Sequence, residues 1–165
     1  MARRKVNTQP FWRLMFLVYC ALMLWLLYGR GRGVNPNIPY WDQVQHNLVL
    51  TPFYTIRTFF YIVLRQPNHP EYWLCLTNLI GNLFLFIPAG YLLPRIFKKF
   101  RPFWRFFLKG LLILLIVELT QLFSLLGVFD VDDLILNTLG FVTGYGIYLL
   151  VKKIAKLTKK ASAGT

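Results

Sequence analysis

Four long apolar runs alternate with polar segments along this chain of 165 residues. They cover about residues 11–28, 72–93, 106–126 and 134–151, and we expect Pro94 to end the second. An α-helix of roughly 20 residues crosses the ~30 Å hydrocarbon core of a bilayer, and each run approaches that length. We therefore predict an all-α integral membrane protein, built as a small bundle of four transmembrane helices.

A fifth apolar stretch covers about residues 48–64. Pro52 and Arg57 interrupt it, and an arginine in the middle of a span is costly in lipid. A fifth span would also place the N-terminus and the basic segment after the second span on opposite sides. We expect an interfacial or re-entrant helix on the outer face instead.

Composition and charge support a membrane protein and orient it. Only 15% of the residues are charged, against about 25% in a soluble domain. Net charge is +13. Of the 19 basic residues, 15 lie before or in the first turn of the first span, between the second and third spans or in the first turn of the third, or after the fourth. By the positive-inside rule these segments and both termini are cytoplasmic. Residues 152–165 would form a basic, frayed tail, and the charge would attract anionic lipid and no nucleic acid.

Polar residues within the spans are expected to face the bundle interior, because lipid cannot satisfy them. Helical spacing places Asn78 with Asn82 on one face, and Glu118 with Gln121 on another, while Asn137 comes from the fourth span. Asparagines can simply hydrogen-bond between helices. An ionisable residue inside a span, however, indicates a functional site by default, so we predict a ligand-binding pocket around Glu118.

Three acidic residues, Asp130, Asp132 and Asp133, precede the fourth span. One aspartate is enough to cap a helix N-terminus, so three suggest a further role. Carboxylate oxygens suit a divalent cation. In an enzyme these three residues would hold the metal, with Glu118, Asp132 and Asp133 as catalytic groups. The alternative is a purely structural cluster of helix caps.

Gly140 and Gly144 lie one turn apart on the fourth span. This spacing is typical of a close-packing seam between transmembrane helices. The seam can lie within the bundle, or it can join two copies of the chain into an oligomer.

Taken together, these motifs resemble the VanZ-like family over roughly residues 46–146. The matching stretches are Asn78-x-x-x-Asn82 followed by Pro88-x-Gly90, then Glu118-x-x-Gln121, then Asp130-x-Asp132-Asp133-x-x-x-Asn137-Thr138-x-Gly140. The resemblance implies a multi-pass protein of the bacterial cytoplasmic membrane. The family's founding member is linked to resistance to teicoplanin, a lipid-bearing glycopeptide that binds peptidoglycan precursors outside the membrane.

The sequence departs from the family at basic positions. An upstream arginine appears as His46, and the loop before Asp130 has no basic residue. If those groups hold an anionic ligand in the family, this protein would either bind a different ligand or use Arg57 in their place.

Three functions follow as alternatives. The first is a protein of the outer leaflet that binds a lipid-linked cell-wall precursor, or alters how a lipoglycopeptide antibiotic reaches it. The second is a metal-dependent membrane enzyme acting on a lipid-linked or phosphate-bearing substrate. The third is a transporter or scaffold subunit.

Overall fold

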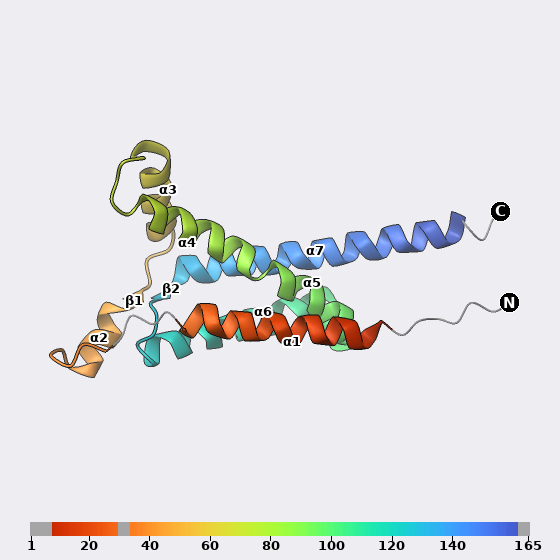
Figure 1. The fold of residues 1–165 in the computed structure, drawn as a ribbon, viewed down its shortest axis with the longest axis horizontal. Helices are drawn as coiled ribbons and strands as arrows, with labels where there is room; N and C mark the ends of the chain where they lie inside the picture. The colour runs from red at the N-terminus through yellow and green to blue at the C-terminus, as the bar shows by residue number, and fades with distance from the viewer. Residues whose placement is uncertain (1–7, 30–33, 162–165) are drawn as a thin grey trace.

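The computed structural model describes residues 8–29 and 34–161, and four of its helices or helix pairs are long and apolar enough to cross a membrane. They are α1 (Gln9–Tyr28), the pair α4 (Tyr72–Leu85) and α5 (Ile87–Ile96), α6 (Phe103–Phe123) and α7 (Val131–Ala161). All four run along the long axis of the molecule (Figure 1). The predicted four-span helical bundle is therefore confirmed.

Short elements complete the chain. They are α2 (Tyr40–His46), β1 (Leu48–Val49), α3 (Tyr54–Arg65), the 3₁₀ turn η1 (Lys98–Phe100) and β2 (Phe129–Asp130). β1 and β2 pair in parallel, with Leu48 opposite Phe129. This small ladder ties the segment before α3 to the loop before α7.

The two ends of the bundle carry opposite charge. The start of α1, the connection from α5 to α6 and the end of α7 lie together at one end, which we call the basic end (Figure 1). α2, α3 and the β-ladder lie at the other, which we call the acidic end. Five of the six acidic residues are found there, and Glu118 is the sixth, within α6.

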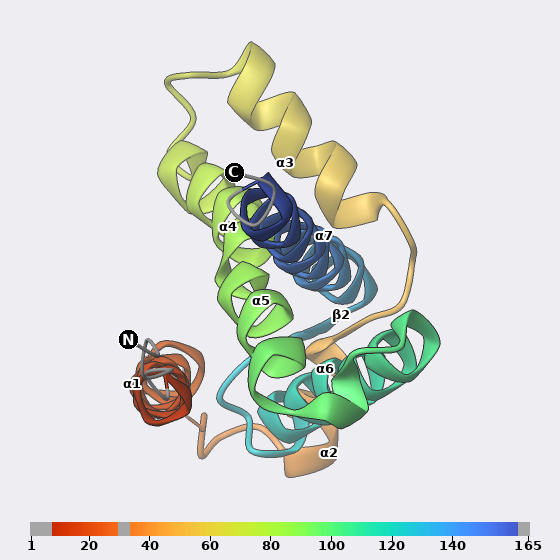
Figure 2. The same cartoon turned by 90° about the vertical axis from the view of Figure 1, so that its right-hand side faces the viewer.

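Helix α3 lies across the acidic end, roughly perpendicular to the bundle axis, in both views (Figures 1 and 2). Its 12 residues give a length of roughly 18 Å, too short for the hydrocarbon core. A helix too short to cross the membrane is therefore present where one was expected, and the segment does not form a fifth span.

The second span is bent. Phe86 separates α4 from α5, and Pro88 lies in the first turn of α5. Proline has no N–H to donate to the preceding turn, which explains a break at this point. Pro94, expected to end the span, is accommodated inside α5, which continues to Ile96.

Glycines bring this bent span into backbone contact with α7. A Cβ atom added to Gly140 would overlap the carbonyl oxygen of Leu83, and one added to Gly144 would overlap that of Ile87. Small residues permit such close approach between membrane helices. The seam therefore lies within the bundle, which is the first of the two alternatives for Gly140 and Gly144.

Aromatic packing fills the basic half of the bundle. The rings of Phe106 and Phe141 stack at 4.2 Å between centroids, and Tyr145 adds a third ring at 4.4 Å from Phe106. α7 then continues as a helix to Ala161. The expectation of a frayed tail is therefore wrong for residues 152–161, and residues 162–165 lie outside the described part. Lysine has high helix propensity, which favours this continuation.

Candidate functional site

Asp132 anchors α3 to the start of α7. Its side chain is fully buried, and its two carboxylate oxygens accept hydrogen bonds from the backbone N–H groups of Phe53 and Ile56. Phe53 precedes α3 in a left-handed conformation with φ of 63°, which is unusual for a bulky residue. Asp132 therefore caps a helix that lies 76 residues away in sequence.

Asp130 has a related role. One oxygen accepts the backbone N–H of Asp132 at 2.8 Å and so caps α7, while the other accepts the hydroxyl of Thr55 at 2.6 Å. All four oxygens of Asp130 and Asp132 are thus occupied by donors from the chain. This is the structural alternative that the sequence left open.

The acidic side chains do not fit the predicted metal site. Each carboxylate oxygen of Asp130 and Asp132 already accepts a hydrogen bond that holds α3 or α7. Within residues 8–29 and 34–161, no three acidic, histidine or cysteine side chains are grouped so that they could hold an ion. We therefore derive no chemistry through a metal.

A second group of polar residues lies inside the bundle, and we call it the polar cluster: Asn78, Asn82, Glu118, Asp133 and Asn137. Asn82 donates to the side-chain oxygen of Asn78 at 2.8 Å and lies beside Asp133. Asn137 donates to Glu118 Oε1 at 3.4 Å. Glu118 and Asn137 are both buried. Three spans therefore contribute to one cluster, as the sequence predicted for four of these five residues.

The polar cluster has unused hydrogen-bonding capacity. Among the described residues, Glu118 Oε2, Asp133 Oδ1 and Asn137 Oδ1 are buried without a hydrogen-bond partner. Buried polar atoms are normally paired, and leaving one unpaired costs about 1–3 kcal/mol. All three unpaired atoms are acceptors. The cluster is therefore suited to a group that donates hydrogen bonds or carries positive charge.

Two predicted ligand-binding residues lie elsewhere. Gln121 donates to the backbone oxygen of Leu27 at 3.1 Å, so it joins α6 to the end of α1. Arg57 is exposed on α3, in a shallow hollow that it shares with Tyr54 and Tyr61. Within the part of the chain that the structure describes, neither residue is hydrogen-bonded to the polar cluster.

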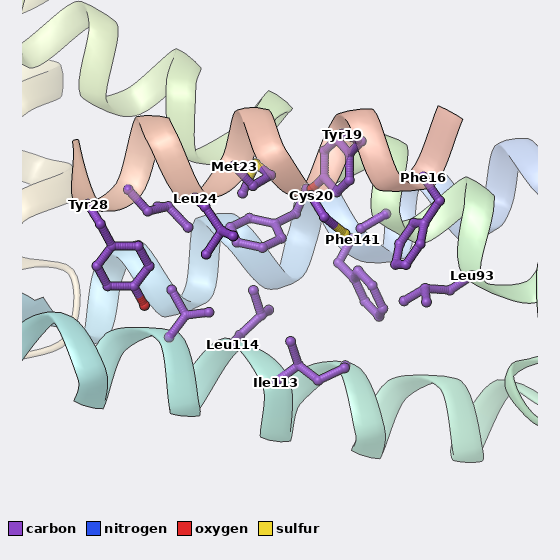
Figure 3. Close-up of a pocket in the computed structure, with 15 residues that line it drawn as sticks. Phe16, Tyr19, Cys20, Met23, Leu24, Tyr28, Leu93, Ile113, Leu114 and Phe141 are labelled. Atoms are coloured by element: carbon purple, nitrogen blue, oxygen red, sulfur yellow. The ribbon is translucent and has the colours of Figure 1, made fainter. Parts of the chain in front are cut away.

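An apolar slot of about 300 Å³ lies between α1 and α6, with α5 and α7 behind it (Figure 3). Phe16, Cys20 and Met23 of α1 face Ile113 and Leu114 of α6 across it. The slot extends along α1 from Phe16 to Tyr28, which is roughly 18 Å at the rise of an α-helix. Its shape and lining suit a single hydrocarbon chain.

Hydrogen bonds close the slot toward the acidic end. The hydroxyl groups of Tyr28 and Thr120 are 2.6 Å apart, and the bond from Gln121 to Leu27 lies beside them in sequence. On α6, Val117 lines the slot and the next residue, Glu118, belongs to the polar cluster. The slot and the cluster therefore reach the same level on two sides of α6.

Sequence reasoning missed both the slot and the residues that close it. Apolar residues that line a slot look the same in a sequence as those that face lipid. Tyr28 ends an apolar run, and Thr120 lies inside one; neither position carries a signal that pairs it with the other.

The fold and the site together define a multi-pass helical membrane protein with a buried polar cluster near one end of its bundle. The sequence model of the VanZ/LLP1 family matches residues 16–152, which is most of the chain. The protein belongs to this family, as its motifs predicted. No curated protein and no solved structure gave a match.

Proposed function

We propose that this protein acts at the outer leaflet of a bacterial cytoplasmic membrane, where it binds lipid-bearing envelope molecules and lowers susceptibility to lipoglycopeptides such as teicoplanin. The observation that carries the proposal is the polar cluster, whose buried acceptors lack partners among the described residues. A polar ligand bearing hydroxyl, amide or ammonium groups would supply the missing donors.

The apolar slot supports a ligand that also carries a hydrocarbon chain. It lies between two spans, in the part of the molecule that lipid surrounds, and reaches the level of Glu118. Burying apolar surface contributes about 25 cal/mol per Å². Because Tyr28, Thr120 and Gln121 close the slot toward the acidic end, an amphipathic molecule would place its chain in the slot and its polar part outside it, at the level of Glu118.

The distribution of charge supports the outer leaflet. Cationic residues gather at the basic end, and the positive-inside rule places such segments in the cytoplasm. The acidic end, with the polar cluster beneath it, would then face outward. Lipid-linked cell-wall precursors and the glycopeptides that bind them are found on that side.

Neutral variants of the cluster test the proposal. Glu118→Gln and Asp133→Asn keep the shape of each side chain but remove its charge. Glu71→Gln is the matched control, because Glu71 is exposed at the same end of the bundle. The measurement is the inhibitory concentration of teicoplanin, and of a glycopeptide without a lipid chain, in a host expressing each variant at equal membrane abundance.

We expect the wild type and Glu71→Gln to raise the inhibitory concentration of teicoplanin only, and the two cluster variants to lose this protection. Full protection by both cluster variants would refute a role for the cluster. An absence of protection by the wild type would refute the lipoglycopeptide proposal itself.

A second pair of variants tests the slot. Ile113→Trp would fill it, because Ile113 projects into the slot from α6 (Figure 3). Ile116→Trp makes the same change on a side chain that is 51% exposed and does not line the slot. Protection should fall with Ile113→Trp alone. Equal behaviour of the two variants would show that the slot does not hold the ligand's chain.

A further inference from the structure

We propose that the basic end holds a second, separate site, which binds the headgroup phosphate of an anionic phospholipid. The site is a hollow of about 510 Å³ between α7 and the segment formed by α5 and η1. We call it the basic hollow. Its cationic lining residues are Arg95, Arg101, Lys152, Lys156 and Lys159.

The lysines of the basic hollow share one face of α7, since positions 152, 156 and 159 are spaced at four and three residues. α7 has 31 residues and a length of roughly 46 Å, so about one third of it extends beyond a ~30 Å hydrocarbon core. If the core begins near the start of α7, Lys152 comes directly after it. The hollow is then at the depth of the lipid headgroups.

Arg95 is held in place at the hollow without a counter-charge. Its guanidinium lies 3.8 Å from the centre of the Trp12 ring, and Nη1 donates to the hydroxyl of Tyr91 at 3.2 Å. Its Nε is buried and has no hydrogen-bond partner among the described residues. A guanidinium fixed in this way at the edge of the hollow is well suited to a phosphate oxygen.

Arg101, which also lines the hollow, is fixed by two hydrogen bonds. Its backbone oxygen accepts the hydroxyl of Tyr145 at 2.6 Å, and its Nε lies 3.4 Å from the oxygen of Pro94. None of the six acidic residues of the chain is at this end of the bundle. The lining of the hollow is therefore a region of concentrated positive charge.

A lipid is the occupant that the position of the hollow favours. Basic pockets between transmembrane helices at the cytoplasmic surface bind anionic headgroups. Val151 and Ala155 add apolar surface between the lysines, where the glycerol and the first methylene groups of a lipid would lie. A soluble phosphate would make no use of that surface.

The test uses the full chain in nanodiscs of phosphatidylcholine, with or without one fifth phosphatidylglycerol. Lys152→Gln with Lys156→Gln removes two charges from the hollow. Lys153→Gln with Lys160→Gln removes two charges from the adjoining side of the same helix, where neither residue lines the hollow. All four lysines are exposed, so both double variants should fold. The readouts are the melting temperature and the phosphatidylglycerol retained by the released protein in native mass spectrometry.

We expect phosphatidylglycerol to raise the melting temperature of the wild type and of the Lys153/Lys160 variant, and to be retained by both. The Lys152/Lys156 variant should lose the shift and at least three quarters of the retained lipid. Equal losses in both variants would overturn the proposal, since they would show general surface attraction only. An equal shift from millimolar sodium phosphate in pure phosphatidylcholine would overturn the assignment to a lipid. Because no antibiotic is used, the result is independent of the proposed function.

Discussion

Replacing Asp132 with asparagine should release α3 from the bundle while leaving the spans in place. The carboxylate accepts two backbone N–H groups, one from Phe53 and one from Ile56. Asparagine has one acceptor oxygen and turns its NH₂ group toward the other donor. A hydrogen bond to a charged group contributes about 1.5–3 kcal/mol, and a buried donor left unpaired costs a similar amount. We therefore expect a loss of roughly 1.5–3 kcal/mol, concentrated on α3.

Hydrogen exchange measured by mass spectrometry gives the local result. Because about 1.4 kcal/mol is a factor of ten, amides of α3 should exchange roughly 10- to 100-fold faster in Asp132→Asn. Those in α6 and in the middle of α7 should change little. Asp42→Asn is the control, since Asp42 is exposed at the same end of the bundle. Unchanged exchange across α3 in Asp132→Asn would refute the reasoning that this carboxylate holds the helix.

Three further outcomes can be measured on the same protein. Gly140→Ala should lower stability by roughly 1–3 kcal/mol in thermal unfolding, since its Cβ would overlap backbone. Gly146→Ala should not, because nothing lies within 4 Å of a Cβ added there, and equal melting temperatures would contradict close packing at Gly140. Tyr28→Phe removes one partly exposed hydrogen bond to α6 and should lower the free energy of unfolding by at most about 1 kcal/mol. A larger loss would contradict a role limited to closing the end of the slot. In intact cells, a membrane-impermeant thiol reagent should label Glu71→Cys and not Lys99→Cys, and the reverse pattern would invert the proposed orientation.

The sequence predicted the spans because hydropathy and length alone determine which segments can cross a bilayer. It predicted most of the polar cluster for a similar reason. Lipid offers no hydrogen-bond partner, so Asn82 and Glu118 must find one inside the bundle. The role of Asp132 could not be predicted. Its partners on α3 are brought to it by tertiary structure, and the pattern Asp-x-Asp-Asp is equally compatible with capping and with metal binding.

The bend in the second span shows a related limit. Both Pro88 and Pro94 can interrupt a helix, and the apolar run predicts that the second span ends at Pro94. The structure bends at Phe86, just before Pro88, where Gly140 and Gly144 allow α7 to approach the altered backbone. Contacts with the neighbouring helix decide which of the two prolines interrupts the span. The sequence of the span alone does not contain those contacts.

The loose attachment of α1 has a consequence for how the protein tolerates change. Met23 is its only buried residue among those described, and its side chains contact the bundle through Trp12 near the start, Tyr19 in the middle and Tyr28 at the end. The slot is therefore bounded by a helix that is mostly exposed and held at a few positions. Such a helix can shift outward to admit chains of different thickness while the other three spans stay packed. Selectivity among hydrocarbon chains would then evolve mainly by exchanging side chains on α1 that line the slot.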